Sequence, residues 1–250
     1  SATISGGDDP SEATITLDND LESNYFVIIQ GADENAGNDD GPDVTYARII
    51  EDPFGTGDLG TSGSNDAITI ERGKDSGNDW IGVVTVVESL SDHTTDGFQL
   101  IDVQELNHGS SDLTGTDTSV SWGAGNLGQI QLVSGPNGAG AYSESSGNSQ
   151  MIACQARVWP TGASTINWER DGTNSGDNSD PEEAWTTVMA VQWGSEWTVQ
   201  GLQLSGNDGG KDINAAGEYA KVTISSVARA NTWVWGSGYT DDNETSNALE

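Results

Sequence analysis

Hydrophobic residues in this chain fall in short runs and not at helical spacing. The runs are rich in β-branched and aromatic residues, and clusters of Gly, Asn and Asp separate them. Alternation of apolar and polar residues between such clusters is typical of strands joined by turns. The pattern predicts strands at 13–17, 25–31, 44–50, 67–72, 80–88 and 98–105, and again at 119–122, 129–134, 151–159, 165–170, 184–193 and 197–204.

The second series of strands repeats residues of the first series in the same order. The matches are 68–72 with 166–170, Arg48 with Arg157, and Trp80 with Trp185. The spacing between matches changes mainly in polar loops, where insertions are tolerated. We therefore expect an all-β fold of tandem antiparallel β-sandwich repeats, of jelly-roll or Ig-like type, in which the matched residues superpose.

Three segments follow from this repeat. The sequence predicts a first β-sandwich repeat at 1–112, a second at 113–208, and the start of a third repeat or a docking and oligomerisation segment at 209–250. The Ser, Gly, Asp and Thr residues of 109–115 indicate a linker. Strands expected at 220–225 and 232–236 are too few to bury a face alone. They complete an earlier sheet, dock on a neighbouring chain, or continue into a longer protein.

Charge is the strongest compositional signal. The chain has 40 acidic and eight basic residues, a formal net charge of -32. Such a field repels nucleic acid and anionic membranes, and concentrated salt screens it. We expect a halophilic protein that binds no nucleic acid, with an ordinary acidic protein as the alternative. The apolar runs are too short for membrane insertion.

The sequence favours a protein that is not an enzyme. Only His93 and His108 could serve as histidine bases, and both are expected in loops without a nucleophile motif beside them. Cys154 is the single cysteine, is expected inside a strand, and cannot form an intrachain disulfide. Among 40 acidic residues some pair always lies at glycosidase spacing, so such a pair carries no information. No catalytic residue and no cofactor-binding residue is predicted.

The repeated charged residues are expected to be structural. Their spacing places Arg48 opposite Glu71, and Arg157 opposite Glu169, on adjacent strands. Cross-strand pairs of this kind contribute under about 1 kcal/mol and help to fix register. Trp80 and Trp185 are assigned the same structural role.

Calcium is the one metal for which the sequence offers ligands. Acidic and amide oxygens are dense between two predicted strands, and calcium prefers several oxygen ligands. The candidate ligands are Asp33, Asn35, Asp39, Asp40 and Asp43. Their spacing lacks the final Glu of a helix-loop-helix calcium site, and a solvated acidic loop is the alternative.

Tryptophans gather in the second half of the chain. Trp193 and Trp197 form one pair and Trp233 and Trp235 another, and even spacing places both rings of a pair on one strand face. Exposed rings could stack on a glycan, whereas buried rings would form core or a contact between subunits.

The repeated pattern resembles a tandem β unit of virion proteins from tailed viruses of bacteria and archaea. The residues that carry the resemblance are Arg48, Glu71-Arg72 and 80–88, then Arg157, Glu169-Arg170 and 185–192. The insertion at 174–183 and the Thr-Thr after Trp185 depart from the pattern. The resemblance implies a tail fibre, a capsid decoration or another external virion component.

The expected function is therefore that of a non-enzymatic virion structural protein, located on the particle surface or extracellular. Its expected partners are copies of itself, other virion proteins and a host surface glycan. The alternative is a secreted carbohydrate-binding or adhesion module.

Overall fold

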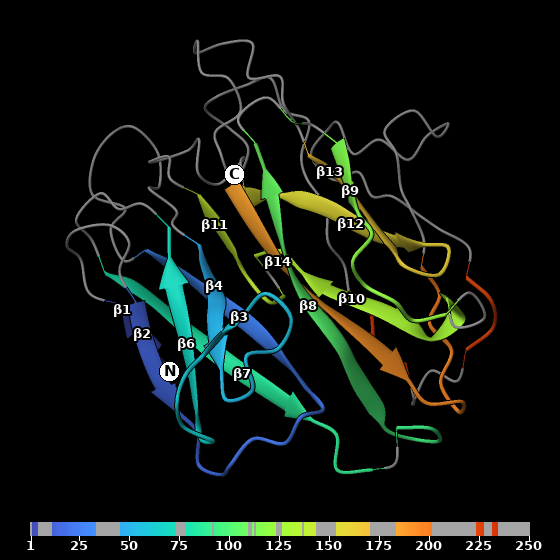
Figure 1. Cartoon of the computed structure of the whole chain (residues 1–250), viewed down its shortest axis with the longest axis horizontal. Helices are drawn as coiled ribbons and strands as arrows, with labels where there is room; N and C mark the ends of the chain where they lie inside the picture. Colours follow the sequence, from blue (N-terminus) through green and yellow to red (C-terminus); the bar gives the residue numbers. More distant parts are fainter. Residues whose placement is uncertain are drawn as a thin grey trace.

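A computed structural model describes most of the predicted strands. The described residues are 2–4, 12–33, 46–73, 79–91, 93–109, 112, 114–123, 127–136, 138–143, 154–170, 184–201, 224–227 and 232–234. They form fourteen strands and one 3₁₀ turn (Figure 1). The elements are β1 (Ala2–Ile4), β2 (Glu12–Thr16), β3 (Tyr25–Asp33), β4 (Ala47–Asp52), β5 (Gly60–Thr61), β6 (Ala67–Arg72), β7 (Trp80–Glu88), β8 (Phe98–His108), β9 (Thr114–Asp117), η1 (Leu127–Gln129), β10 (Ile130–Ser134), β11 (Ala141–Ser143), β12 (Ala156–Thr161), β13 (Thr165–Arg170) and β14 (Ala184–Trp193).

The strands form four sheets, two in each half of the chain. The first half contains the orders β1-β7-β3 and β2-β6-β4-β5. In the second half, β14 pairs along one edge with β8 and along the other with β10 and then β11, while β12-β13-β9 form a separate sheet. All pairs are antiparallel except β4 with β5. The all-β class expected from the sequence is confirmed, with several antiparallel sheets.

The two halves have the same strand order. The sheet β1-β7-β3 corresponds to β8-β14-β10, and β2-β6-β4 corresponds to β9-β13-β12. By strand pairing, β8 belongs to the second half. The sequence had placed 98–105 in the first repeat, whereas β8 pairs with β14 over its whole length.

The arginines of the repeat occupy matching positions, but the tryptophans do not. Arg48 pairs with Glu71, and Arg157 pairs with Glu169, in the registers expected from their spacing. Trp80 is fully buried, and its neighbour Ile81 is 43% exposed. Trp185 instead packs against the ring of Tyr142, with 5.3 Å between the ring centroids.

The superposition of Trp80 on Trp185 is wrong by one residue. Matching Val84 with Val188 aligns the two strands and places Trp80 on Ala184, which is also fully buried. Because strand side chains alternate between faces, a shift of one residue moves a side chain to the other face. Trp185 therefore lies on the face that points away from the core of its own half.

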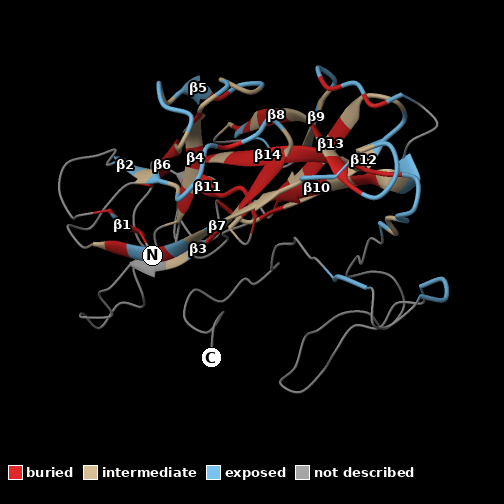
Figure 2. Cartoon of the chain, turned by 90° about the horizontal axis from the view of Figure 1, so that it is seen from below, coloured by how far each residue is buried: buried red, intermediate tan, exposed pale blue. Residues whose placement is uncertain are grey.

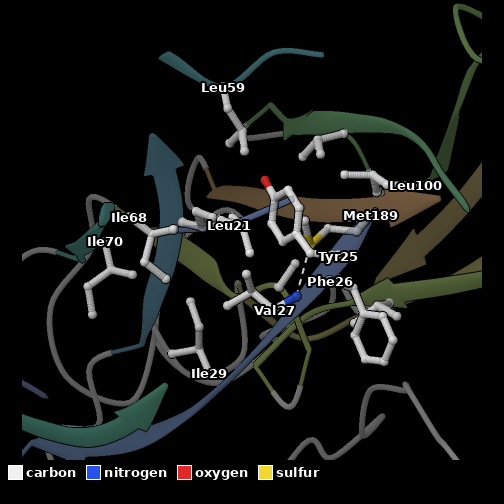
Figure 3. Packing of buried hydrophobic residues seen from close by; sticks show 14 of the residues in the cluster. Leu21, Tyr25, Phe26, Val27, Ile29, Leu59, Ile68, Ile70, Leu100 and Met189 are labelled. Carbon is white, nitrogen blue, oxygen red and sulfur yellow. Dashed lines mark hydrogen bonds between the residues drawn. The ribbon is translucent and has the colours of Figure 1, made fainter. Parts of the chain in front are cut away.

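Two hydrophobic clusters form the core of the described part of the chain, and the larger one contains residues of both halves. Figure 3 shows Met189 of β14 beside Tyr25 and Val27 of β3, with the Val27 amide 3.2 Å from the Met189 sulfur. The second cluster contains Val188 of β14 and Trp168 of β13. Strand β14 is thus buried on both faces, as the red ribbon in Figure 2 shows.

Some elements differ from the sequence expectation. Residues 119–122 form no strand, although Val120 and Trp122 are buried. The linker expected at 109–115 overlaps β9, which pairs with β13. Residues 197–201 form no strand, and neither do 224–227 or 232–234, while the rest of 202–250 lies outside the described residues. A short polar strand such as β9 (Thr-Gly-Thr-Asp) has no apolar alternation that would reveal it.

Candidate interaction site at the junction of the two halves

Arg48 connects the two halves through several contacts. It lies on β4, where its guanidinium is 3.0 Å from the carboxylate of Glu71 and 2.9 Å from that of Glu105 on β8. It also lies over the rings of Tyr142 and Trp185, at 5.0 and 5.7 Å from their centroids. One arginine of the first half therefore binds three residues of the second half.

Burial makes this charge cluster energetically important. The Arg48 side chain is 11% exposed and that of Glu71 is 10% exposed. Burial raises the pKa of Glu71, and the nearby Arg48 charge opposes that rise. Loss of the arginine would leave a buried carboxylate without its cation, which is far more costly than loss of an exposed ion pair.

The matching Arg157 has a different environment. It forms an ion pair with Glu169 on the neighbouring strand, and its guanidinium lies 5.0 Å from the ring centroid of Trp159. Both of these partners belong to the second half. The arginine recurs in the second half, and Arg48 connects the two halves through Glu105, Tyr142 and Trp185.

A glycine-rich loop of the second half inserts into the first half. This junction loop comprises Gly135, Pro136, Gly138, Ala139 and Gly140, between β10 and β11. Ile29 of β3 donates its amide to the Gly138 carbonyl at 2.8 Å, and Ile49 of β4 donates to the Ala139 carbonyl at 3.2 Å. The loop therefore joins the edges of both sheets of the first half.

The close fit of the loop requires glycine. Gly140 has a φ of 101°. An added Cβ there would lie 2.2 Å from the Ala47 carbonyl oxygen and 2.3 Å from the Arg48 Cα. Ala139 is fully buried in the larger cluster. The sequence analysis missed this loop because its residues look like an ordinary surface turn.

A second buried arginine fixes the chain between β8 and β9. The Arg170 guanidinium donates to the carbonyls of His108, Gly109 and Asp112 at 2.6 to 3.2 Å. The His108 ring packs on Trp168 with 4.2 Å between centroids, and its Nε2 lies 2.7 Å from the Thr186 hydroxyl. His108 is therefore a buried residue at the end of a strand, and its expected place in a loop is wrong.

The environment of His108 makes it a poor base at neutral pH. Burial and the positive charge of Arg170 lower its pKa to about 3. Burial also raises the pKa of the fully buried Cys154 thiol, which lies just before β12 and not inside a strand. Both groups are held in their neutral forms, which suits packing.

Asp52 is a buried carboxylate that sequence analysis did not identify. It accepts hydrogen bonds from the Tyr25 hydroxyl, from the amides of Phe54 and Thr56, and from the Thr56 hydroxyl. Burial and the Asp52 charge raise the pKa of Tyr25. All these donors stabilise the turn after β4, so the carboxylate has a structural role.

Three of the four tryptophans proposed as contact residues lie in one aromatic cluster with Phe26 and Phe98. Trp193 is buried and lies 4.7 Å from Trp197 and 6.4 Å from Trp233, measured between ring centroids. Trp233 also stacks on Phe26 at 5.8 Å. Trp197 and Trp233 are 40% and 48% exposed. Trp235 lies outside the described residues.

Most of the expected calcium ligands lie in a part of the chain that the structure does not describe. Asn35, Asp39, Asp40 and Asp43 lie outside the described residues, and for Asp33 only the backbone in β3 is described. Across the described ranges, no group of three or more His, Cys, Asp or Glu residues is placed to hold a metal ion. Those ranges also contain no helix long and apolar enough to cross a membrane.

Comparisons with protein-family models, with curated proteins and with solved structures find no match for this chain. Its function must therefore be argued from its own residues. The described clusters do two things: they hold the two halves together, and they present partly exposed aromatic rings at one end of the junction.

Proposed function

We propose that this chain is a non-enzymatic structural protein of a virus particle, exposed on the particle surface as a tail fibre, decoration or other external component. In this proposal the paired sheets of each half form a sandwich repeat, and the chain works as a rigid tandem unit in concentrated salt. Copies of the chain and other virion proteins are its partners.

The observation that carries the proposal is the rigid junction. The junction loop bonds to β3 and β4, Arg48 binds residues of β8, β11 and β14, and one hydrophobic cluster contains residues of both halves. A shared core of this kind suppresses motion between repeats, which are otherwise mobile when their interface is small and polar. A rigid tandem of repeats suits a load-bearing external component, and a net charge of -32 suits exposure to brine.

The location is tested directly on purified particles. An antibody against this chain should label intact virus particles from a hypersaline sample in electron micrographs, and mass spectrometry should find the chain in the same gradient fraction. A chain found only in the particle-free supernatant would contradict the proposal.

The exposed aromatic cluster favours a second candidate, a carbohydrate-binding or adhesion module. Trp197 and Trp233 present partly exposed rings beside Trp193, and aromatic faces stack on sugars. Binding of the intact chain to a glycan array in molar KCl, lost on Trp197→Ala, would favour this candidate. Unchanged glycan binding by Trp197→Ala would show that the aromatic cluster is not the glycan-binding site.

A further inference from the structure

In the described part of the chain, one edge of strand β7 is open along most of its length. The corresponding edge of β14 in the second half is paired along its whole length. In the second half, β8 pairs with β14 from Ala184 to Trp193. In the first half, β1 occupies the corresponding edge of β7 only from Trp80 to Gly82. Among the described residues, nothing pairs with this edge from Val83 to Glu88.

Backbone directions identify which groups point to that edge. Ser89 donates its amide to the Asn24 carbonyl on the β3 side at 2.9 Å. Amide directions alternate along a strand, so odd-numbered residues of β7 point to β3 and even-numbered residues point to the other edge. The amides and carbonyls of Val84 and Val86 are therefore directed to the edge that lacks a neighbouring strand in the described part of the chain.

Side chains along this edge also lack the burial found in the second half. Val84 and Val86 are only partly buried, whereas the corresponding Val188 and Ala190 are fully buried. Val83 is 51% exposed. The sequence from 83 to 87 is Val-Val-Thr-Val-Val, without the charges or prolines that protect edge strands from pairing with another chain.

A segment near the end of the second half resembles β8, the strand that pairs with the equivalent edge of β14. Val103-Gln104-Glu105-Leu106 of β8 recurs as Val199-Gln200-Gly201-Leu202, and Asp112 recurs as Asp208 at the same spacing. The described part of this segment, 197–201, belongs to no sheet. Val199 donates its amide to the Gly128 carbonyl in the second half at 2.7 Å, and its side chain packs against the larger cluster.

We propose that residues 197–201 of a second copy of this chain add as a strand to the open edge of β7. This inference names the self-assembly contact of the structural role proposed above and rests on that role. Residues 83–87 and 197–201 carry no charged side chain, so these two stretches can approach although each chain has a net charge of -32, and Glu88 and Glu196 lie just beyond them. Strand addition of this kind joins copies head to tail, because the donor and acceptor surfaces differ.

The β8–β14 register predicts the pairing. Val103 lies opposite Met189, and these correspond to Val199 and Thr85. Thr85 is odd-numbered, so Thr85 and Val199 would form a pair without mutual hydrogen bonds, with their Cα atoms about 4.5 Å apart. That separation suits a disulfide.

Two variants, each with one cysteine added to the buried Cys154, test this contact. Thr85→Cys and Val199→Cys are mixed in molar KCl under mild oxidation, and a heterodimer should form as the main cross-linked product. Asp66→Cys, on an exposed turn, replaces Thr85→Cys as the control and should cross-link at least about tenfold less. Absence of the heterodimer, or an intrachain link in the double variant Thr85→Cys/Val199→Cys, would overturn the proposal.

A backbone variant gives an independent readout. Val86→Pro removes an amide directed to the open edge and keeps the hydrogen bonds to β3. Self-association of this variant, measured by sedimentation, should weaken by about tenfold, as loss of roughly 1.4 kcal/mol predicts. Unchanged association of a folded variant contradicts the contact. If the chain is present in particles but the cross-link does not form, this contact is wrong and the structural role stands. If the cross-link forms but the chain is absent from particles, the contact stands and the structural role is wrong.

Discussion

At the scale of single residues, the repeated arginines have diverged in role. Arg48 and Arg157 occupy equivalent positions in strand register, and each pairs with the glutamate of its Glu-Arg motif. Only Arg48 also contacts Glu105 of β8 and the rings of Tyr142 and Trp185. The sequence could predict the cross-strand pairs from spacing. It could not predict the contacts between halves, because these depend on how the sheets pack.

This difference predicts unequal effects of the same substitution. Arg48→Met should lower the free energy of unfolding by about 3 kcal/mol, because Glu71 becomes a buried carboxylate without its cation. Arg157→Met is the matched control and should lower it by about 1 kcal/mol or less. Urea unfolding at pH 7 in constant molar KCl measures both. Equal losses would show that Arg48 does not hold the junction.

His108 predicts a dependence of stability on pH. Its pKa falls from an ordinary 6.5 to about 3 in the folded chain, so below pH 6.5 the unfolded chain binds the proton more readily. The contribution of neutral His108 to the free energy of unfolding is fully present above pH 6.5 and is lost as the pH falls towards 3. Between pH 7 and pH 5 the wild type should lose about 2 kcal/mol from this group.

The variant His108→Gln should not show this loss. Glutamine keeps a group able to bond to the Thr186 hydroxyl but has no proton to gain, so its urea-unfolding free energy should change less between pH 7 and pH 5. Burial raises the pKa of Glu71, which acts in the opposite sense, but both proteins contain Glu71 and the comparison cancels its effect. His93→Gln, which also removes one histidine, is the control. The interpretation fails if His108→Gln follows the wild-type curve.

At the scale of elements, the best predicted strands are those with a long apolar run or a regular alternation of apolar and polar residues. β6, β7, β13 and β14 have the bounds that the sequence predicts. The strands that were missed are short or polar, as in β5 (Gly60–Thr61), and have no period of their own. The error of one residue between Trp80 and Trp185 has a similar cause: matching by residue type ignores which face the side chain occupies.

The junction loop is the element whose disruption should separate the halves. Gly140→Ala places a Cβ 2.2 Å from the Ala47 carbonyl oxygen at a residue with φ of 101°. The strain and the collision together should lower the free energy of unfolding by about 3 kcal/mol or more. The matched control is Gly162→Ala, which has φ of 60° but nothing within 4 Å of the added Cβ.

Gly162→Ala should lose only the cost of the strained backbone, about 1 kcal/mol. Both variants are compared by urea unfolding, and limited proteolysis locates the damage. We expect Gly140→Ala to become cleavable between β7 and β8, where the chain passes from one half to the other. If the two variants lose equal stability, the loop does not depend on its close contact with β4.

At the scale of the whole molecule, the repeat and the charge are the features that the sequence revealed most clearly. The shared strand order of the halves supports a duplication that short motifs had indicated. The packing of the halves was not predictable, because β14 reads as one apolar run whether one face or both are buried. Both its faces are in fact buried, one against β13 and one against the first half.

The charge predicts how the whole molecule responds to salt. With 40 acidic and eight basic residues, repulsion within the folded chain should be strongest at low ionic strength. Thermal melting in KCl from about 0.1 M to 3 M should show a rising Tm, with most of the rise below about 1 M, where the Debye length has fallen to roughly 3 Å. Salts that strengthen apolar burial instead act in proportion to their concentration and show no such plateau. A Tm that rises steadily through 3 M would assign the effect to burial, and a flat or falling Tm would contradict adaptation to brine.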